Sequence, residues 1–559
     1  MMHEPKELLA RLDDLKTARK NFDTLFDEVQ QLVWPDGATF LTKRSPGEKT
    51  HQKIYDATAT YALDKFEAAM ESFLIPRHLR WHGLRAISDE LNEQREVKTF
   101  FEFLTKLLFQ YRERPSAQFY SQMGENLRSL GAYGTGCLYV DESPTKQGFR
   151  YRHIPVSRIW IETNYAGIVD TVYHEYPLTA RMAAQKWPDD VPEKAAKALE
   201  AGRPGEEQTY LHVVMPNDPE KIDPFSLVPD RHPFIGYDIE CQTKSVIMHE
   251  SMLDEGALES TYGYHELPYI VSRLTVNPNE MWGRSPAMAA LPDIKGLQEM
   301  MKTLLRSAQK AADPPLLVAH DGRLGRGRRK VRLDSGGLTY GAVDESGRPK
   351  IIPLETRARL DIQLEMMEQK RDAIFDAFFV KLFDILNRDR VEMTATEVVE
   401  RSKEKGQLIT PIVGRQQSEM LGPMIEREIS ILQRQGGIEV PQVLLDPDIG
   451  GFETEYDTLA TRMQQSDEMA AYQRLLAMFE IQIQQDPLLM EVLRAEDAMR
   501  TFGETSGIRA TLFRSKDEMA EIRKQQAQEA QQAQMAEQAL PVAQAAKTVA
   551  EIPTGEEAA

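Results

Sequence analysis

Residues 286–312 read PAMAALPDIKGLQEMMKTLLRSAQKAA, a segment with the apolar spacing of a long amphipathic helix. At 1.5 Å per residue this helix would be about 39 Å long. The sequence Asp313-Pro314-Pro315 predicts where it ends, because proline pushes the residue before it out of the helical conformation. Apolar side chains form one stripe along it, at Ile294, Leu297, Met301, Leu304, Ala308 and Ala311.

A second long helix is predicted at 357–386, and a small β-like module separates it from the first. Glycines divide this module into short runs at 316–319, 330–333, 338–340 and 350–354. Two long helices of similar length that flank a small β module are the most informative feature of the chain. The apolar face of the second helix comprises Leu360, Leu364, Met367, Ile374, Phe378, Leu382 and Ile385.

The sequence before residue 286 changes from helical to β-like patterns. Helices are predicted at 5–33, 51–75 and 92–130, and a short one at 179–187. Residues 131–275 are rich in β-branched and aromatic runs, which predict antiparallel strands. These runs lie at 137–140, 159–161, 169–173, 210–214 and 234–240.

After the second long helix we expect a short charged loop at 387–393 and then further helices over 394–520. Thr394 and Glu397 have the spacing of a capping box, and breaks are expected at Pro411, Gly436-Gly437 and Pro441. The segment 521–559 is rich in Gln, Ala and Glu, which suits an exposed helix or a disordered tail. The sequence therefore predicts an α+β fold that is mainly α, with several domains in its 559 residues.

The formal net charge of −19 argues against a protein that grips DNA through its phosphates, because such binding needs a basic surface. Loose contact through local basic patches or a channel is compatible with it, and so is an acidic surface that only keeps the protein soluble. No apolar run reaches the length needed to cross a bilayer, and the first residues lack the apolar core of a secretory signal. Two cysteines cannot form a disulfide framework, which fits a reducing cytoplasm.

Catalytic and metal motifs are mostly missing. The sequence has no phosphate loop of the G-x-x-x-x-G-K-[ST] type, and Gly131, Gly134 and Gly136 precede a strand, which predicts a tight turn. His78 and His82 lack the glutamate of a zinc protease helix, and Pro447 argues against calcium at Asp446 and Asp448. Cys137 and Cys241 are expected to be buried structural thiols. We therefore expect no enzyme activity, no cofactor and no metal.

Two groups of basic residues are candidates for contact with a partner. The first is a glycine-interleaved cluster that either meets phosphates or carboxylates or is a solvated loop. The second repeats every four residues along the first long helix and faces DNA, a neighbouring subunit's acids, or solvent. The cluster consists of Arg323, Arg326, Arg328, Arg329, Lys330 and Arg332, and the helix stripe of Lys302, Arg306 and Lys310.

Several segments, in this order, resemble the head-to-tail connector, or portal, family of short-tailed bacteriophages. They run from residue 50 to about residue 440 and include a G-x-x-G-T-G turn into a strand and the approach to the first long helix. The segments are Lys53-Ile54-Tyr55-Asp56-Ala57-Thr58-Ala59, Leu130 to Val140, Trp282-Gly283-Arg284-Ser285-Pro286, Leu291 to Lys295, Met393 to Val398 and Leu408 to Arg415.

The resemblance implies a portal fold with wing, stem, clip and crown regions in a dodecameric ring. The wing would be 1–285, the stem helices 286–312 and 357–386, the clip 313–356, and the channel loop 387–393, with 394–520 completing the wing and forming the crown. The tail 521–559 lies outside the resemblance.

The implied function is a conduit at the capsid vertex of the virion, for packaging and ejection of double-stranded DNA, assembled in the host cytoplasm. Implied partners are the terminase large subunit, tail adaptor and nozzle proteins, and major capsid and scaffolding proteins; no membrane is involved. Arg388 and Arg390 would approach DNA in the channel, and the 323–332 cluster would dock the motor and tail proteins.

Two other classes of protein remain open at this stage. A nucleic-acid-processing enzyme would need clustered metal ligands or a phosphate loop. A scaffold or internal core protein would be almost wholly helical, which the β-rich segments 131–275 and 316–354 count against.

Overall fold

The structure is a computed structural model, and it divides into two compact units. The first unit comprises 1–81 and 107–439, and the second 82–106 and 440–559. The structure describes 4–318, with gaps at 43, 46, 78, 93, 144–146, 224–225, 227, 251–257 and 260, and then 343, 346–353, 360–381, 411–438, 440–445, 451–456 and a few isolated positions beyond.

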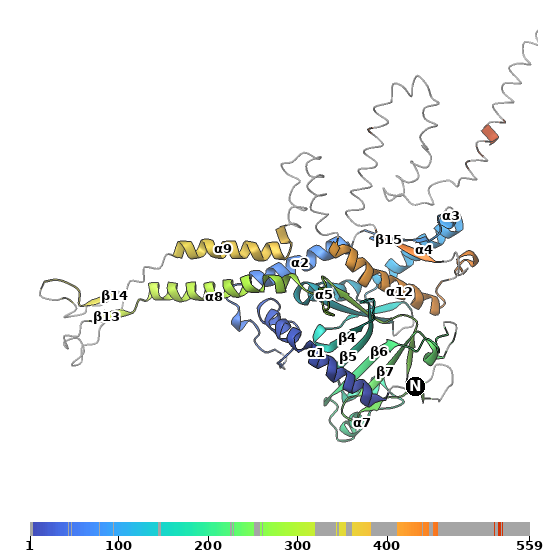
Figure 1. The fold of residues 1–559 in the computed structure, drawn as a ribbon, viewed down its shortest axis with the longest axis horizontal. Coiled ribbons are helices and arrows are strands. Elements are labelled where there is room, and N and C mark those ends of the chain that lie inside the picture. Colours follow the sequence, from blue (N-terminus) through green and yellow to red (C-terminus); the bar gives the residue numbers. More distant parts are fainter. Residues whose placement is uncertain are drawn as a thin grey trace, which may run out of the picture. The chain divides into compact units, whose positions relative to one another are not determined.

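Helices surround two antiparallel sheets in the first unit (Figure 1). The larger sheet has the strand order β11-β7-β6-β5-β4, with β8 beside β7, and the smaller one has the order β12-β2-β3. The helices are α1 Pro5–Leu32, α2 Thr58–Leu74, α5 Phe119–Tyr133, α6 Ala180–Lys186, α7 Glu193–Glu200, α8 Pro286–Ala312, α9 Leu360–Ala377 and α12 Gly422–Arg434. The strands are β2 Thr135–Glu142, β3 Phe149–His153, β4 Ile159–Thr163, β5 Val169–Thr179, β6 Glu207–Pro216, β7 Phe234–Glu240, β8 Ser245–Val246, β9 His249–Glu250, β10 Leu258–Glu259, β11 Tyr262–Tyr264, β12 Tyr269–Arg273, β13 Leu316–Val318 and β14 Ile351–Pro353.

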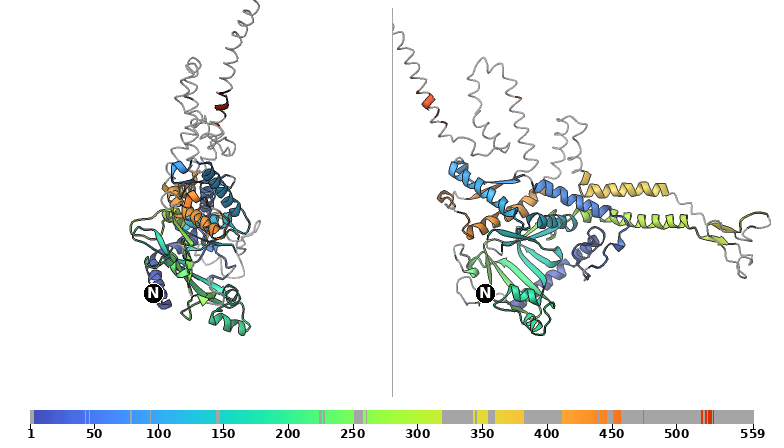
Figure 2. Two further views of the ribbon diagram at one scale, coloured as in Figure 1. Left: turned by 90° about the vertical axis from the view of Figure 1, so that its right-hand side faces the viewer. Right: turned by 180° about the vertical axis from the view of Figure 1, so that it is seen from behind.

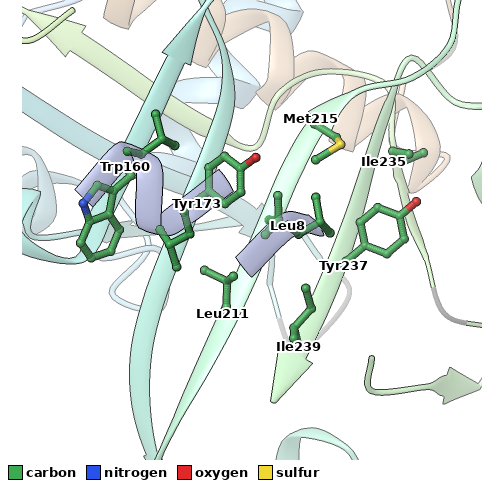
Figure 3. Close-up of a cluster of buried hydrophobic side chains, with 11 residues drawn as sticks. Leu8, Trp160, Tyr173, Leu211, Met215, Ile235, Tyr237 and Ile239 are labelled. Carbon is green, nitrogen blue, oxygen red and sulfur yellow. The ribbon is translucent and has the colours of Figure 1, made fainter. Parts of the chain in front are cut away.

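Strand β6 shows why the larger sheet has a helix on each face. Alternate side chains of a strand point to opposite faces, so Leu211, Val213 and Met215 share one face. They pack against the apolar stripe of α1, which includes Leu8 (Figure 3). Tyr210 points to the other face and packs against Trp187 and the alanines of α6 and α7.

The predicted α+β class with mainly helices is confirmed. The five strands expected in 131–275 are present as β2, β4, β5, β6 and β7, and the short helix expected at 179–187 is α6. The helices expected at 5–33 and 286–312 correspond to α1 and α8. Two of the four runs of the small β module pair as β13 and β14, and the other two lie outside the described residues.

Two predicted helices are broken in the structure. The one expected at 92–130 is divided into α4 Arg95–Arg112 and α5, because Pro115 and a left-handed Gln118 interrupt it. The one expected at 357–386 is described from Leu360, and α9 ends at Ala377, with Phe379 in the left-handed region at a φ of 59°.

The second unit contains a strand that the sequence did not predict. Within 394–520, expected to be helical, Phe452–Tyr456 forms β15, which pairs with β1 His82–Ala86. Arg85 and Glu453 form an ion pair of 2.9 Å across this ladder. The short helix α3 Asp89–Asn92 follows β1, and α4 begins in the same unit.

The glycine-rich turn after α5 was correctly predicted as a structural turn. Gly134 has a φ of 72°, and a Cβ on it would lie 2.5 Å from the carbonyl carbon of Arg284. A Cβ on Gly283 would overlap the carbonyl oxygen of Gly134. Two backbones therefore pass each other where only glycine fits, which joins the turn to the start of α8.

A polar cluster is buried between the two sheets. The Tyr269 hydroxyl on β12 lies 3.1 Å from Nδ1 of His174 on β5 and 2.7 Å from Nδ1 of His212 on β6. One hydroxyl has a single proton, so it donates to one ring and accepts an N–H from the other. Burial lowers the pKa of His212 to about 4 and that of His174 well below its usual value.

We expect the stability of the fold to decrease as the pH falls from 6.5 to 5. The unfolded chain takes up protons on these histidines near pH 6.5, whereas the folded state keeps them neutral, so acid favours unfolding. Each histidine contributes at most about 1.4 kcal/mol per pH unit. Melting temperatures measured across this range should show a shallower dependence for His212→Gln. An unchanged dependence, equal to that of a control at the exposed His51, would contradict the assignment.

Candidate functional site

The two long helices α8 and α9 lie side by side as an antiparallel hairpin (Figures 1 and 2). Met367 and Ile374 form the buried face of α9, and Phe378, just after the helix ends, is also buried. Lys370 on α9 forms a 2.6 Å ion pair with Asp293 on α8, which fixes the height of one helix against the other.

Helix α8 begins where the sequence predicted, for reasons that the structure makes explicit. The Ser285 hydroxyl accepts a hydrogen bond from the N–H of Met288, 3.1 Å away, and donates one to the carbonyl of Ala132. Pro286 occupies the first helical position, where its missing N–H costs nothing. The hairpin therefore starts from the glycine turn after α5.

Asp56 holds both helices of the hairpin to the body. Its Oδ1 accepts a 2.9 Å hydrogen bond from the N–H of Thr58, and its Oδ2 accepts bonds of 3.1 and 2.7 Å from Nε and Nη2 of Arg371 on α9. Gln298 on α8 accepts from the backbone N–H groups of Tyr55 and Asp56 and donates 2.6 Å to the Asp56 carbonyl. We call Asp56, Gln298 and Arg371 the anchor.

The anchor carboxylate is stabilised in its charged form. Burial by itself would raise the pKa of Asp56, but the hydrogen bonds from Thr58 and Arg371 outweigh burial and lower it. The predicted helix 51–75 was too long at its start. The segment begins with the 3-10 turn His51–Lys53, and α2 starts only at Thr58, whose N–H donates to Asp56.

An open pocket of about 410 Å³ lies beside the anchor. It is lined by aromatic and apolar side chains of the loop before α2, of α2 itself and of both hairpin helices. Tyr55 and Tyr61 are 43% and 52% exposed, which is high for side chains of this size. The lining consists of Tyr55, Asp56, Ala57, Thr58, Tyr61, Met301, Arg371 and Phe375.

The burial of α8 changes along its length. From Pro286 to Gln298 one face is buried against the body, whereas no residue from Glu299 to Ala312 is fully buried. The stripe Lys302, Arg306 and Lys310 lies on this outer half. Lys302 contacts Glu299 of its own helix at 3.1 Å, and Arg306 and Lys310 have no ion-pair partner among the described residues.

The other predicted site residues lie outside the described residues. These are Arg388 and Arg390 and the cluster Arg323, Arg326, Arg328, Arg329, Lys330 and Arg332, together with Thr394 and Glu397 of the capping box and His78. Cys137 is buried, as predicted, and burial raises the pKa of its thiol; Cys241 is only half-buried. No group of three metal-ligating side chains occurs among the residues described.

Sequence reasoning missed the contacts that join distant segments. The anchor links residues 242 and 315 positions apart, and no local pattern indicates such pairs. Another missed pair is Arg112 and Glu428, both fully buried and 2.5 Å apart, with Tyr151 also donating to Glu428. Arg427 donates a 2.7 Å bond to the Val140 carbonyl, so α12 packs back onto the smaller sheet.

The chain is similar to known proteins over most of its length. Residues 5–513 match the family described as "Bacteriophage head to tail connecting protein". The chain belongs to this family. The resemblance stated from the sequence is thereby confirmed, and the chain is a connector at the junction of the phage head and tail.

Two curated relatives agree with the assignment. The connector is 26% identical over 569 residues to the portal protein of Salmonella phage epsilon15, covering all of this chain and 97% of the relative. It is 25% identical over 536 residues to the probable portal protein of Bordetella phage BPP-1, covering 94% and 92% of the two chains. A chain from the solved virion of a native gene transfer agent particle aligns with a TM-score of 0.35 and 11% identity, over 81% of this chain and 95% of that one, which is too distant to support an argument.

The segments that carried the resemblance meet in the connector's structure. Asp56 lies in the first segment and anchors the hairpin, while Gly134 and Gly283 belong to two later segments and touch each other.

Within the described part of the chain, every helix is too short or too polar to span a bilayer.

We expect Gln298→Ala to lower the free energy of unfolding by about 1–3 kcal/mol, because two backbone N–H groups and one carbonyl lose their partner in a buried place. Chemical denaturation of the purified connector measures this change. Gln309→Ala on the exposed half of the same helix is the matched control and should have little effect. Equal stabilities for the two variants would show that the anchor does not hold the hairpin.

Proposed function

We propose that the connector is one subunit of a ring at the capsid vertex, and that double-stranded DNA passes through this ring during packaging and ejection. The observation that supports it best is the hairpin. The outer half of α8 has apolar residues with little cover in a single chain, and Leu305 is 44% exposed. On α9, Leu364 and Met366 are each 49% exposed. Copies placed side by side around an axis would cover such surfaces.

We assign each region of the proposed ring to a segment of the chain. In this proposal α8 and α9 are the stem, β13 and β14 belong to the clip, and the two sheets with α1, α2 and α5 form the wing, which α12 completes. The remaining helices to about residue 520 form the crown. A dodecamer is the expected ring, with the virion as its location and the host cytoplasm as the place of assembly.

DNA and proteins are the proposed partners. Twelve subunits of −19 give a ring with a formal charge of −228. In this proposal the lumen is largely acidic, so that DNA slides through it without its phosphates being held. The arginine cluster at 323–332 would dock the terminase large subunit during packaging and tail adaptor and nozzle proteins later. Major capsid and scaffolding proteins would surround the wing. The connector itself would be no enzyme, and energy would come from the motor.

Purified connector should form annular particles with a mass near twelve times 63.7 kDa. Light scattering measures the mass, and negative-stain images show the ring directly. Neither ATPase nor nuclease activity is expected in the same preparation. A compact monomer under conditions that favour assembly would contradict the proposal.

Arg388 and Arg390 are proposed to touch DNA in the channel. Changing both to glutamate should reduce DNA packaging or retention without preventing ring assembly, since the added negative charges repel phosphates. Packaged DNA is quantified in particles assembled with the variant. Unchanged packaging and retention would remove these residues from the channel.

A further inference from the structure

The hairpin has two stripes of opposite charge on different sides. On α8, Lys302 and Arg306 lie one turn apart, off the face formed by Ile294 and Leu297. On α9, acidic residues follow one another at spacings of three and four, and this face points away from the buried Met367 and Ile374. The acidic stripe consists of Asp361, Glu365, Glu368, Asp372 and Asp376.

Much of this charge is not neutralised within one chain. Lys381 lies 3.3 Å from Asp372 and 3.2 Å from Asp376, so the inner end of the acidic stripe has a counter-charge. Among the residues that the structure describes, Asp361, Glu365 and Arg306 form no ion pair. Within the described part of the chain, the ion-pair partner of Lys302 is Glu299 of its own helix, an exposed pair of the kind that contributes little and exchanges easily.

The ion pair between Asp293 and Lys370 is a reference point from which the position of each stripe along the hairpin, here called its height, can be counted. Lys302 follows Asp293 by nine residues, and Asp361 precedes Lys370 by nine, so both lie about 14 Å outward from that pair. Arg306 lies one turn farther out, about 6 Å, which its long side chain spans. Lys310 lies two turns farther out, beyond the reach of Asp361.

Equal height matters because rotation about an axis parallel to the hairpin leaves height unchanged. Two complementary surfaces on different sides of one subunit cannot meet within that subunit, but they meet between neighbours in a closed ring. We propose that Lys302 and Arg306 of one copy pair with Asp361 and Glu365 of the next. The inference rests on the proposed ring, and it assigns this part of the basic stripe to a neighbouring subunit and not to DNA.

A charge swap tests the pairing. The variants Lys302→Glu/Arg306→Glu and Asp361→Lys/Glu365→Lys should each reduce the fraction of rings on the order of tenfold or more, since each places like charges opposite each other at every interface. The chain with all four changes should recover most of the rings, because the pairs form again with their signs exchanged. Ring fractions are measured by light scattering and negative stain at low salt, where such pairs are least screened.

The controls separate this pairing from other roles of the same residues. Lys194→Glu/Lys197→Glu on the surface helix α7 makes the same change of net charge as the α8 variant Lys302→Glu/Arg306→Glu. This control should assemble like the unmodified chain. Circular dichroism melts establish that each variant is folded. Recovery in the fourfold variant supports the pairing, and a general loss of folding cannot produce it.

The remaining outcomes overturn the inference in distinguishable ways. If the α8 variant forms rings normally and instead loses DNA retention, the stripe contacts DNA and the pairing is wrong. If both reversals leave the rings intact, or the fourfold variant does not recover them, the pairing is wrong while the ring remains. If the unmodified chain forms no rings, the proposed function fails and this inference with it.

Discussion

The carboxylate of Asp56 lies where three distant parts of the chain meet, and the hairpin depends on it. It accepts hydrogen bonds from Thr58 at the start of α2 and from Arg371 on α9, while Gln298 on α8 binds its backbone. A buried carboxylate is stable only when its oxygens are satisfied, so removing one partner affects the others. Through this one residue the position of both long helices is set relative to the body.

A second constraint is steric and acts just before the start of α8. Gly134 and Gly283 pass so closely that a side chain on either would overlap the other segment. Since α8 begins three residues after Gly283, this crossing sets the direction in which the hairpin starts. The anchor and the glycine crossing together determine how the hairpin is joined to the rest of the first unit.

The positions of the charged residues say more about possible contacts of this protein than its net charge does. The whole chain has a net charge of −19, but over the hairpin charge is distributed unevenly, with basic residues on the outer half of α8 and a stripe of acids on α9. A total charge informs on solubility and on general repulsion of DNA, whereas a local arrangement determines which partner a surface fits. The acidic total and the basic stripe are therefore compatible features of one connector.

Much of this protein was determined by its sequence alone. The amphipathic period of 286–312, the proline that starts α8 and the β-branched runs of 131–275 depend on neighbouring residues, and they predicted elements that the structure contains. The family resemblance also came from local segments. The break at Pro115 was a local signal, which the prediction of one helix over 92–130 did not use. Neighbouring residues do not decide the end of α9 at Ala377 or the strand Phe452–Tyr456, whose partner β1 lies some 370 residues earlier.

Only the tertiary structure decided the candidate site. Asp56, Gln298 and Arg371 are ordinary polar residues in the sequence, and their role appears when folding brings them within hydrogen-bond distance. Likewise, only the pair between Asp293 and Lys370 shows that Lys302 on α8 and Asp361 on α9 lie at the same distance along the hairpin. Periodicity is a property of adjacent residues, whereas a contact over hundreds of positions depends on the packing of the whole unit.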